Sequence, residues 1–155
     1  MLNKNFNRLL SAYFGTGNTT NSGFIGINGS ITTVSGNSFQ NSATANNSTN
    51  IDTSGSGQTG VFLFTEEFEE SIETCTIPTE FTNYSVESTS KMSASDLISF
   101  MYSRTIIPKE DATIKSIGLI TAYTQPSALI AFENLAEPVQ LTAGEPHTFT
   151  FTIKV

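Results

Sequence analysis

Residues 147–155 restrict the fold of this chain more than any other segment. From Thr148 onward the polar residues Thr148, Thr150, Thr152 and Lys154 alternate with the apolar residues Phe149, Phe151, Ile153 and Val155. Successive side chains of a β-strand point to opposite faces of its sheet, so a strand with one buried face shows this period of two. The alternation predicts a strand whose Phe and Ile side chains are buried and whose Thr side chains face outward.

Shorter apolar segments upstream predict more strands. Residues 112–123 and 127–132 flank Thr124-Gln125-Pro126, a break of turn length, and this arrangement predicts a hairpin. Residues 138–141 form a further short strand candidate, and the turn over 142–146 leads into the final strand. Short strands at a spacing of about ten residues indicate an all-β fold, a sandwich of jelly-roll or immunoglobulin-like type.

Residues 95–107 allow two readings. Ser95 is a good helix N-cap, so a helix could begin there. The Phe, Tyr, Ile and Thr content favours a strand that runs to Ile107 and ends at Pro108. We prefer the strand.

An acidic segment precedes these strands. Thr65 can cap a helix that places Phe64, Phe68 and Ile72 on one face, which predicts a short amphipathic helix of two turns. Its carboxylates, at Glu66, Glu67, Glu69 and Glu70, could bind a hard cation such as calcium. The cluster lacks the alternating Asp and Asn residues around a Gly that calcium loops use, so we interpret it as a solvated acidic face.

Residues 1–60 differ in composition from residues 61–155, which form the predicted β-sandwich domain. The first segment contains only three charged residues, Lys4, Arg8 and Asp52, and is rich in Asn, Ser, Thr and Gly. It offers too little apolar surface to offset the entropy lost on ordering it. We therefore expect an extended, low-charge N-terminal arm that packs along a partner, with residues 24–34 pairing as a strand with an edge. The expected assembly contacts are Phe6, Leu9, Leu10, Tyr13, Phe24, Ile25, Ile27 and Ile31.

Charge and composition disfavour several classes of function. Fourteen acidic against seven basic residues give a net charge of −7, which disfavours a nucleic-acid partner. One His and one Cys can supply neither an internal disulfide nor a zinc site of the usual kinds. Apolar runs fall far short of the ~20 residues that span a bilayer, and the first residues lack a signal-peptide pattern. We expect no cofactor, no metal, no membrane contact and synthesis in a cytosol.

The residues that could take part in catalysis or phosphate binding have structural explanations. His147 stands at the start of the final strand, where a surface or strand-cap role is common. Cys75 lies in a candidate strand without a second thiol or a basic neighbour in sequence, which indicates a buried small side chain. Gly15-Thr16-Gly17 lacks the third glycine of a phosphate loop because position 20 is Thr, so it indicates a turn. We expect no enzymatic activity and no catalytic residue.

The C-terminal third resembles small virion structural proteins of tailed bacteriophages. The resemblance rests on Gly15-Thr16-Gly17, Ser103–Ile106, Ala112–Ile120, Leu129–Phe132, Glu137–Glu145 and the closing Thr/Phe strand. Such proteins carry a strand-turn-strand of the form I-x-E-I-G-L, a following A-R-x-x-F-x-P-V and a final alternating strand after an x-G-D/E turn. The chain departs from this pattern at Ser116, where an acid is usual, and at Phe132, where a basic residue would fall.

The resemblance implies a virion protein made in the host cytoplasm, either a capsid decoration (cement) subunit or a collar or tail accessory subunit. Its partners would be copies of itself and capsid, neck or tail proteins. A carbohydrate-binding or adhesin module of β-sandwich type is the alternative, although sugar platforms favour Trp and the chain has none. A small hydrolase built around His147 is a third possibility, and it requires a polar pocket there.

Overall fold

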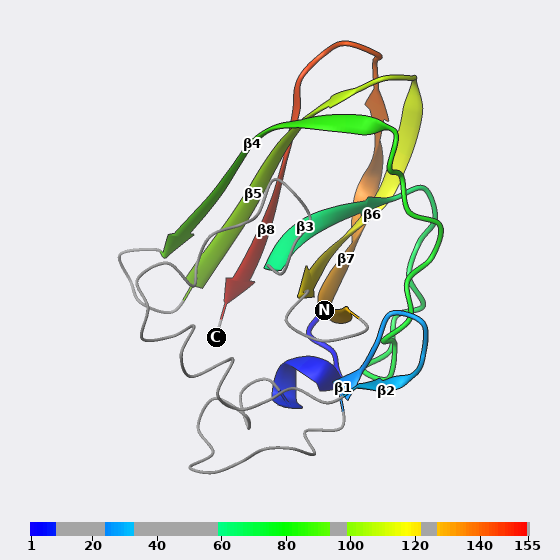
Figure 1. Ribbon diagram of the computed structural model, residues 1–155, viewed down its shortest axis with the longest axis vertical. Coiled ribbons are helices and arrows are strands. Elements are labelled where there is room, and N and C mark those ends of the chain that lie inside the picture. The colour runs from blue at the N-terminus through cyan, green and yellow to red at the C-terminus, as the bar shows by residue number, and fades with distance from the viewer. Residues whose placement is uncertain (9–23, 33–58, 94–98, 122–126, 155) are drawn as a thin grey trace.

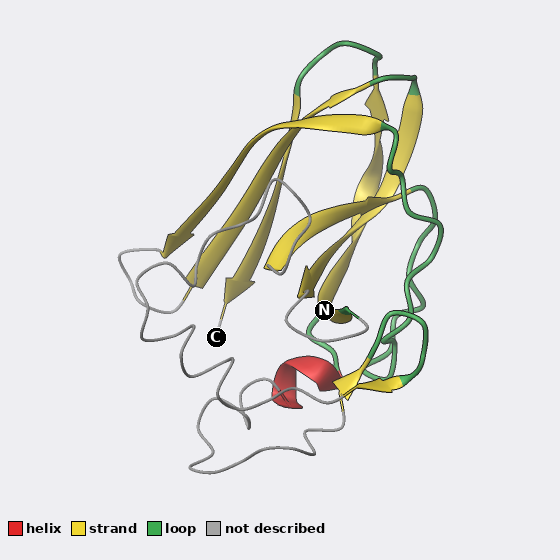
Figure 2. Ribbon diagram, viewed as in Figure 1, coloured by secondary structure: helices red, strands yellow, loops and turns green. Residues whose placement is uncertain are grey.

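The computed structural model describes residues 1–8, 24–32, 59–93, 99–121 and 127–154. These residues form eight strands and one short helical segment, residues 4–8 (Figure 1, Figure 2). The strands are β1 (Phe24–Ile25), β2 (Ile31–Thr32), β3 (Thr59–Phe64), β4 (Tyr84–Ser93), β5 (Ser99–Pro108), β6 (Ala112–Thr121), β7 (Ala128–Leu141) and β8 (His147–Lys154). The predicted all-β class is therefore confirmed.

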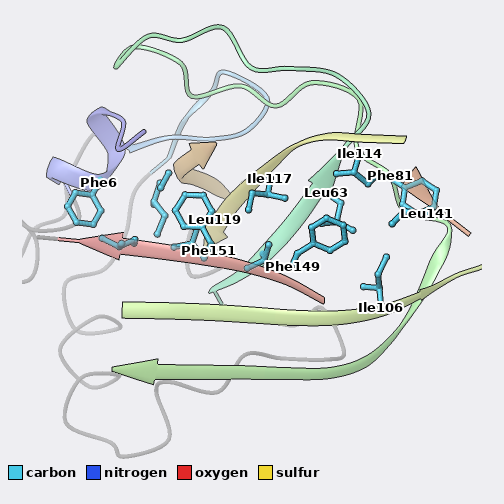
Figure 3. Close-up of a cluster of buried hydrophobic side chains, with 14 residues drawn as sticks. Phe6, Leu63, Phe81, Ile106, Ile114, Ile117, Leu119, Leu141, Phe149 and Phe151 are labelled. Atoms are coloured by element: carbon cyan, nitrogen blue, oxygen red, sulfur yellow. The ribbon is translucent and has the colours of Figure 1, made fainter. Parts of the chain in front are cut away.

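Two three-stranded antiparallel sheets, β3-β6-β7 and β4-β5-β8, contribute to one hydrophobic core (Figure 1). Leu63 and Leu119 reach this core from the first sheet, and Ile106, Phe149 and Phe151 reach it from the second (Figure 3). The predicted phase of β8 is confirmed over residues 148–153, where the three apolar side chains are buried and the three Thr side chains are exposed. This alternation fixes which face of β4-β5-β8 meets the core.

The predicted hairpin is confirmed as β6 and β7, which pair antiparallel. Residues 138–141, predicted as a separate strand, are the end of β7, so that prediction is wrong in its boundary. The register shifts between Ile114 and Ser116, where β7 accommodates extra residues and still continues. Pro138 is tolerated because β7 is an edge strand. The predicted turn before β8 is confirmed and contains Gly144 at a φ of +82°, a conformation that suits glycine.

The strand reading of residues 95–107 is confirmed from Ser99 onward, and β5 ends at Pro108 as expected. Residues 94–98, where a helix could have begun, lie outside the described residues.

The helix predicted over residues 64–72 is wrong. Phe64 ends β3, Phe68 lies in an irregular segment, and Ile72 is 62% exposed. Side chains of the sheet satisfy the backbone here: Asn134 accepts from Phe68 N–H at 2.8 Å and donates to Phe68 C=O at 3.0 Å. Ser116 Oγ donates to the carbonyl of Glu66 at 2.6 Å. These long-range bonds replace the local bonds of a helix.

This irregular segment covers a second hydrophobic cluster on the other face of β3-β6-β7. The cluster consists of Phe64, Phe68, Ile120, Leu129 and Phe132. Phe68 stacks on Phe132 with ring centroids 4.7 Å apart. A Cβ on Gly118 would lie 2.9 Å from Leu129 Cδ1 and 3.0 Å from Phe64 Cε2, so a larger residue there would force these buried side chains to shift. The sheet β3-β6-β7 is therefore buried on both faces, whereas the outward side chains that the structure describes on β4-β5-β8 are exposed or half-buried.

Candidate assembly surfaces

The outward face of β4-β5-β8 is lined mainly by hydroxyl groups. Thr105 pairs with Thr148 and Ser103 with Thr150 in the register of β5 and β8. In each pair the two side-chain oxygens are 2.8 Å apart. Because a hydroxyl both donates and accepts, each can still bond to a further group in front of the sheet.

We call this surface the hydroxyl face. Its described side chains are Ser85, Ser88, Met101, Ser103, Thr105, Ile107, Thr148, Thr150 and Thr152. Ionisable residues lie at its margins: Glu87 at the bulge between Val86 and Ser88, Lys109 just after β5, and Lys154 opposite Ser99 at the end of β8. A protein surface that docks on this face would not have to desolvate a charge at its centre.

The four outer edges of the two sheets differ in how they are protected. Leu2 forms a bridge with Ala131 along β7, and Glu80 forms one with Phe64 along β3. The edge strand β4 carries a bulge at Glu87. Coverage, charge and bulges are the usual means by which proteins prevent edge-to-edge association. In β8, residues 148–153 contain no charge, proline or bulge, and within the described chain this strand pairs only with β5.

The N-terminal residues are attached to the fold by two asparagines. Asn3 caps the helical segment, because its Oδ1 accepts from Asn5 N–H at 3.0 Å, and its Nδ2 donates to the carbonyls of Thr74 and Leu129. Asn5 is fully buried and exchanges two bonds with the backbone of Ile25, at 2.7 and 2.9 Å. Asn5 therefore connects β1 to the sheet, and neither asparagine was identified from the sequence.

The structure places the expected assembly contacts in different environments. Phe6 is buried in the core, Ile25 and Ile27 are half-buried, and Ile31 is 78% exposed. Leu9, Leu10, Tyr13 and the side chain of Phe24 lie outside what the structure describes, as does Gly15-Thr16-Gly17.

Residues 24–34 were expected to pair as a strand with an edge of a partner, and the structure shows how the described part of this segment pairs within the chain. Within the described residues 24–32, β1 pairs with β2 in a hairpin of its own and adds to no other strand. The hairpin contacts the rest of the chain through Asn5 and through the bond from Ile27 N–H to the carbonyl of Ser127, at 2.8 Å.

A buried arginine was also not predicted. Arg104, on β5, is 6% exposed, lies 4.7 Å over the ring of Phe62 and donates to Tyr84 Oη at 3.1 Å. Its Nε has no hydrogen-bond partner within the described residues. Burial raises the pKa of the Glu80 carboxyl, and the charge of Arg104 lowers it by a smaller amount. Burial also raises the pKa of the Tyr84 hydroxyl.

We expect Glu80→Gln to raise the melting temperature at pH 7. The folded-state pKa of this carboxyl lies above the unfolded value, so stability falls as pH rises from the unfolded pKa through the folded one. An amide does not ionise, so the advantage of the variant should shrink toward pH 4. Thermal melts at both pH values, with the exposed Glu110→Gln as control, measure this. A less stable variant at pH 7 would show that attraction to Arg104 outweighs burial.

The acidic segment borders a cavity of about 380 Å³. Its lining includes Glu67, Glu69, Phe68 and Cys75. Cys75 is buried, as predicted, although the expected strand around it is an irregular segment, and burial raises the pKa of its thiol. Within the described part of the chain, no three His, Cys, Asp or Glu side chains are grouped to hold a metal ion.

His147 begins β8 and is half-buried. Its Nε2 accepts from Thr142 N–H at 3.4 Å, across the turn that precedes the strand. The predicted position at the strand start is confirmed, and this bond gives the side chain a structural role there.

No helix among the described residues is long and apolar enough to cross a membrane.

Comparison of the chain with protein-family models, with curated proteins and with solved structures found no match.

Proposed function

We propose that the chain is a structural subunit of a tailed-bacteriophage virion, either a capsid decoration protein or a collar or tail accessory protein. It would act without catalysis, through contacts with copies of itself and with capsid, neck or tail proteins. Its two sheets would form a sandwich of jelly-roll or immunoglobulin-like type. The observation that carries the proposal is the hydroxyl face, a nearly uncharged sheet surface on a chain of net charge −7.

The physical argument concerns the cost of burying a surface. An interface loses free energy for each charged group that it desolvates without a partner. The hydroxyl face avoids this cost, because its Ser and Thr groups can bond to backbone or side-chain groups of a partner. The residues that carry the resemblance to virion proteins lie mainly in β5, β6, β7 and β8, so they include two strands of this face, β5 and β8.

The test is incorporation into particles. Mass spectrometry of purified phage particles from the producing host should detect the chain at a fixed copy number that survives a salt wash. Thr105→Glu places a carboxylate on the central strand of the hydroxyl face, and we expect incorporation to fall on the order of tenfold, the effect of ~1.4 kcal/mol. Thr142→Glu, on the exposed turn before β8, is the matched control. Absence from the particles, or unchanged incorporation of Thr105→Glu, would overturn the proposal.

The carbohydrate-binding alternative requires exposed aromatic rings as sugar platforms. The aromatic side chains whose exposure the structure describes are buried or half-buried, so no observation favours this alternative.

A further inference from the structure

We infer that β8 of one copy pairs antiparallel with β8 of a second copy across a two-fold axis through Thr150. The inference rests on the proposed function and deepens it, since it names a specific contact between two copies of the chain. A strand edge carries unpaired N–H and C=O groups, and a second strand satisfies them. The occupant is a second copy because the sequence of β8 is complementary to itself.

The alternation of β8 limits the possible registers. A two-fold axis through a residue pairs positions of equal parity, so Thr stays opposite Thr and Phe stays opposite Phe. An axis between two residues would place Thr opposite Phe. The apolar side chains of one copy would then lie on the solvent-facing side of the other copy's sheet. Only registers centred on a residue therefore keep the core side of both copies intact.

Charge selects between the two central registers. With the axis at Thr150, Thr148 lies opposite Thr152 and Phe149 opposite Phe151, and no formally charged residue enters the paired stretch 147–153. With the axis at Phe151, Lys154 would lie opposite Thr148. The register through Thr150 gives the longest uncharged pairing.

The net charge of the chain favours the same edge. Copies that each carry −7 repel one another on approach, and the repulsion is smallest where neither presents a charge. The edge of β3 is bridged at Phe64, the edge of β7 is bridged at Ala131 and carries Glu133 and Glu137, and the edge of β4 carries Glu87. Pairing through β8 would join two three-stranded sheets into one six-stranded sheet with a continuous hydroxyl face.

The test uses disulfide formation across the axis. Residues directly opposite in an antiparallel pair have Cβ atoms roughly 4.5–5.5 Å apart, close to the range that a disulfide spans. Thr150 is exposed, so Thr150→Cys should fold. In a buffer with oxidised glutathione we expect it to form a covalent dimer at least about tenfold faster than Thr142→Cys, which lies on the exposed turn. The wild-type chain, whose single Cys75 is buried, should remain unlinked.

Two further variants test the register. Thr148→Cys alone should not form the dimer rapidly, whereas a mixture of Thr148→Cys and Thr152→Cys should form a mixed dimer. Equal rates for Thr150→Cys and Thr142→Cys would overturn the inference. Rapid linkage in a mixture of Thr150→Cys and Thr152→Cys, with none in Thr150→Cys alone, would overturn the register. Either result would contradict the β8 pairing alone. The proposed function is tested separately by Thr105→Glu, because Thr105 lies on β5, away from this edge.

Discussion

Replacing Phe151 by alanine is expected to lower the free energy of unfolding by about 3–5 kcal/mol, the usual cost of removing a buried aromatic ring. Phe151 is 3% exposed and lies in the core between the two sheets (Figure 3). A domain of this size has a total stability of roughly 5–15 kcal/mol, so the variant should be partly unfolded at moderate temperature.

Urea denaturation measures this change. Far-UV circular dichroism is the signal to follow, because the chain has no Trp whose fluorescence could report unfolding. Thr152→Ala is the matched control, since Thr152 is the next residue on β8 and is exposed. It should change stability by less than about 0.5 kcal/mol. A Phe151→Ala variant as stable as this control would show that β8 contributes little to the core.

Strands were predictable where the sequence shows a local pattern, either alternating side chains or a short apolar segment bounded by a turn. The pattern of β8 was identified with the correct phase, and the hairpin of β6 and β7 was identified from two apolar segments around a proline turn. In β5 the Phe, Tyr and Ile content indicated a strand although a helix could also have begun nearby. These elements depend on short-range patterns, which a sequence displays directly.

Elements whose conformation depends on strand pairing or tertiary hydrogen bonds, without a local apolar pattern that indicates it, were missed. The strand β4 contains mostly Ser, Thr and charged residues, and no periodic apolar pattern indicates it. Its position follows from pairing with β5, the next strand along the chain, and not from an apolar pattern of its own. The predicted helix over residues 64–72 had a suitable spacing of apolar residues, but Asn134 and Ser116 bind its backbone from β7 and β6. Tertiary hydrogen bonds outweighed local propensity in this segment.

The buried polar residues were also invisible in the sequence. Arg104 is placed among aromatic side chains by its inward position on β5, and its type alone indicated an exposed residue. Asn3 and Asn5 belong to a segment whose composition indicated weak order. Their partner Leu129 lies more than 120 residues away, so no local pattern could identify the contact. The candidate surface was missed for the same reason, because the hydroxyl face exists only once β5 and β8 are paired.

Asn5→Ala is expected to release the β1–β2 hairpin from the fold. The change leaves the N–H and C=O groups of Ile25 without their partner, and each buried group left unpaired costs about 1–3 kcal/mol. The carbonyl of Leu129 keeps its bond from Asn3 Nδ2 at 2.9 Å, so the loss falls mainly on the hairpin. Because the hairpin can detach and expose these groups to water, local opening limits the loss of global stability.

Hydrogen exchange on a dilute, monomeric sample distinguishes this local opening from global unfolding. In the wild-type chain, the amides of Ile25 and Ile27 should exchange slowly, since both donate to groups of the same chain. In Asn5→Ala both should exchange at least about tenfold faster, as expected for a loss of ~1.4 kcal/mol or more. The control Asn7→Ala changes an exposed side chain of the same type two residues away and should leave both amides protected. Fast exchange of both amides in the wild-type monomer would show instead that this part of the N-terminal segment requires a partner, because the intrachain bonds from Asn5 and Ser127 would then be too weak to hold it.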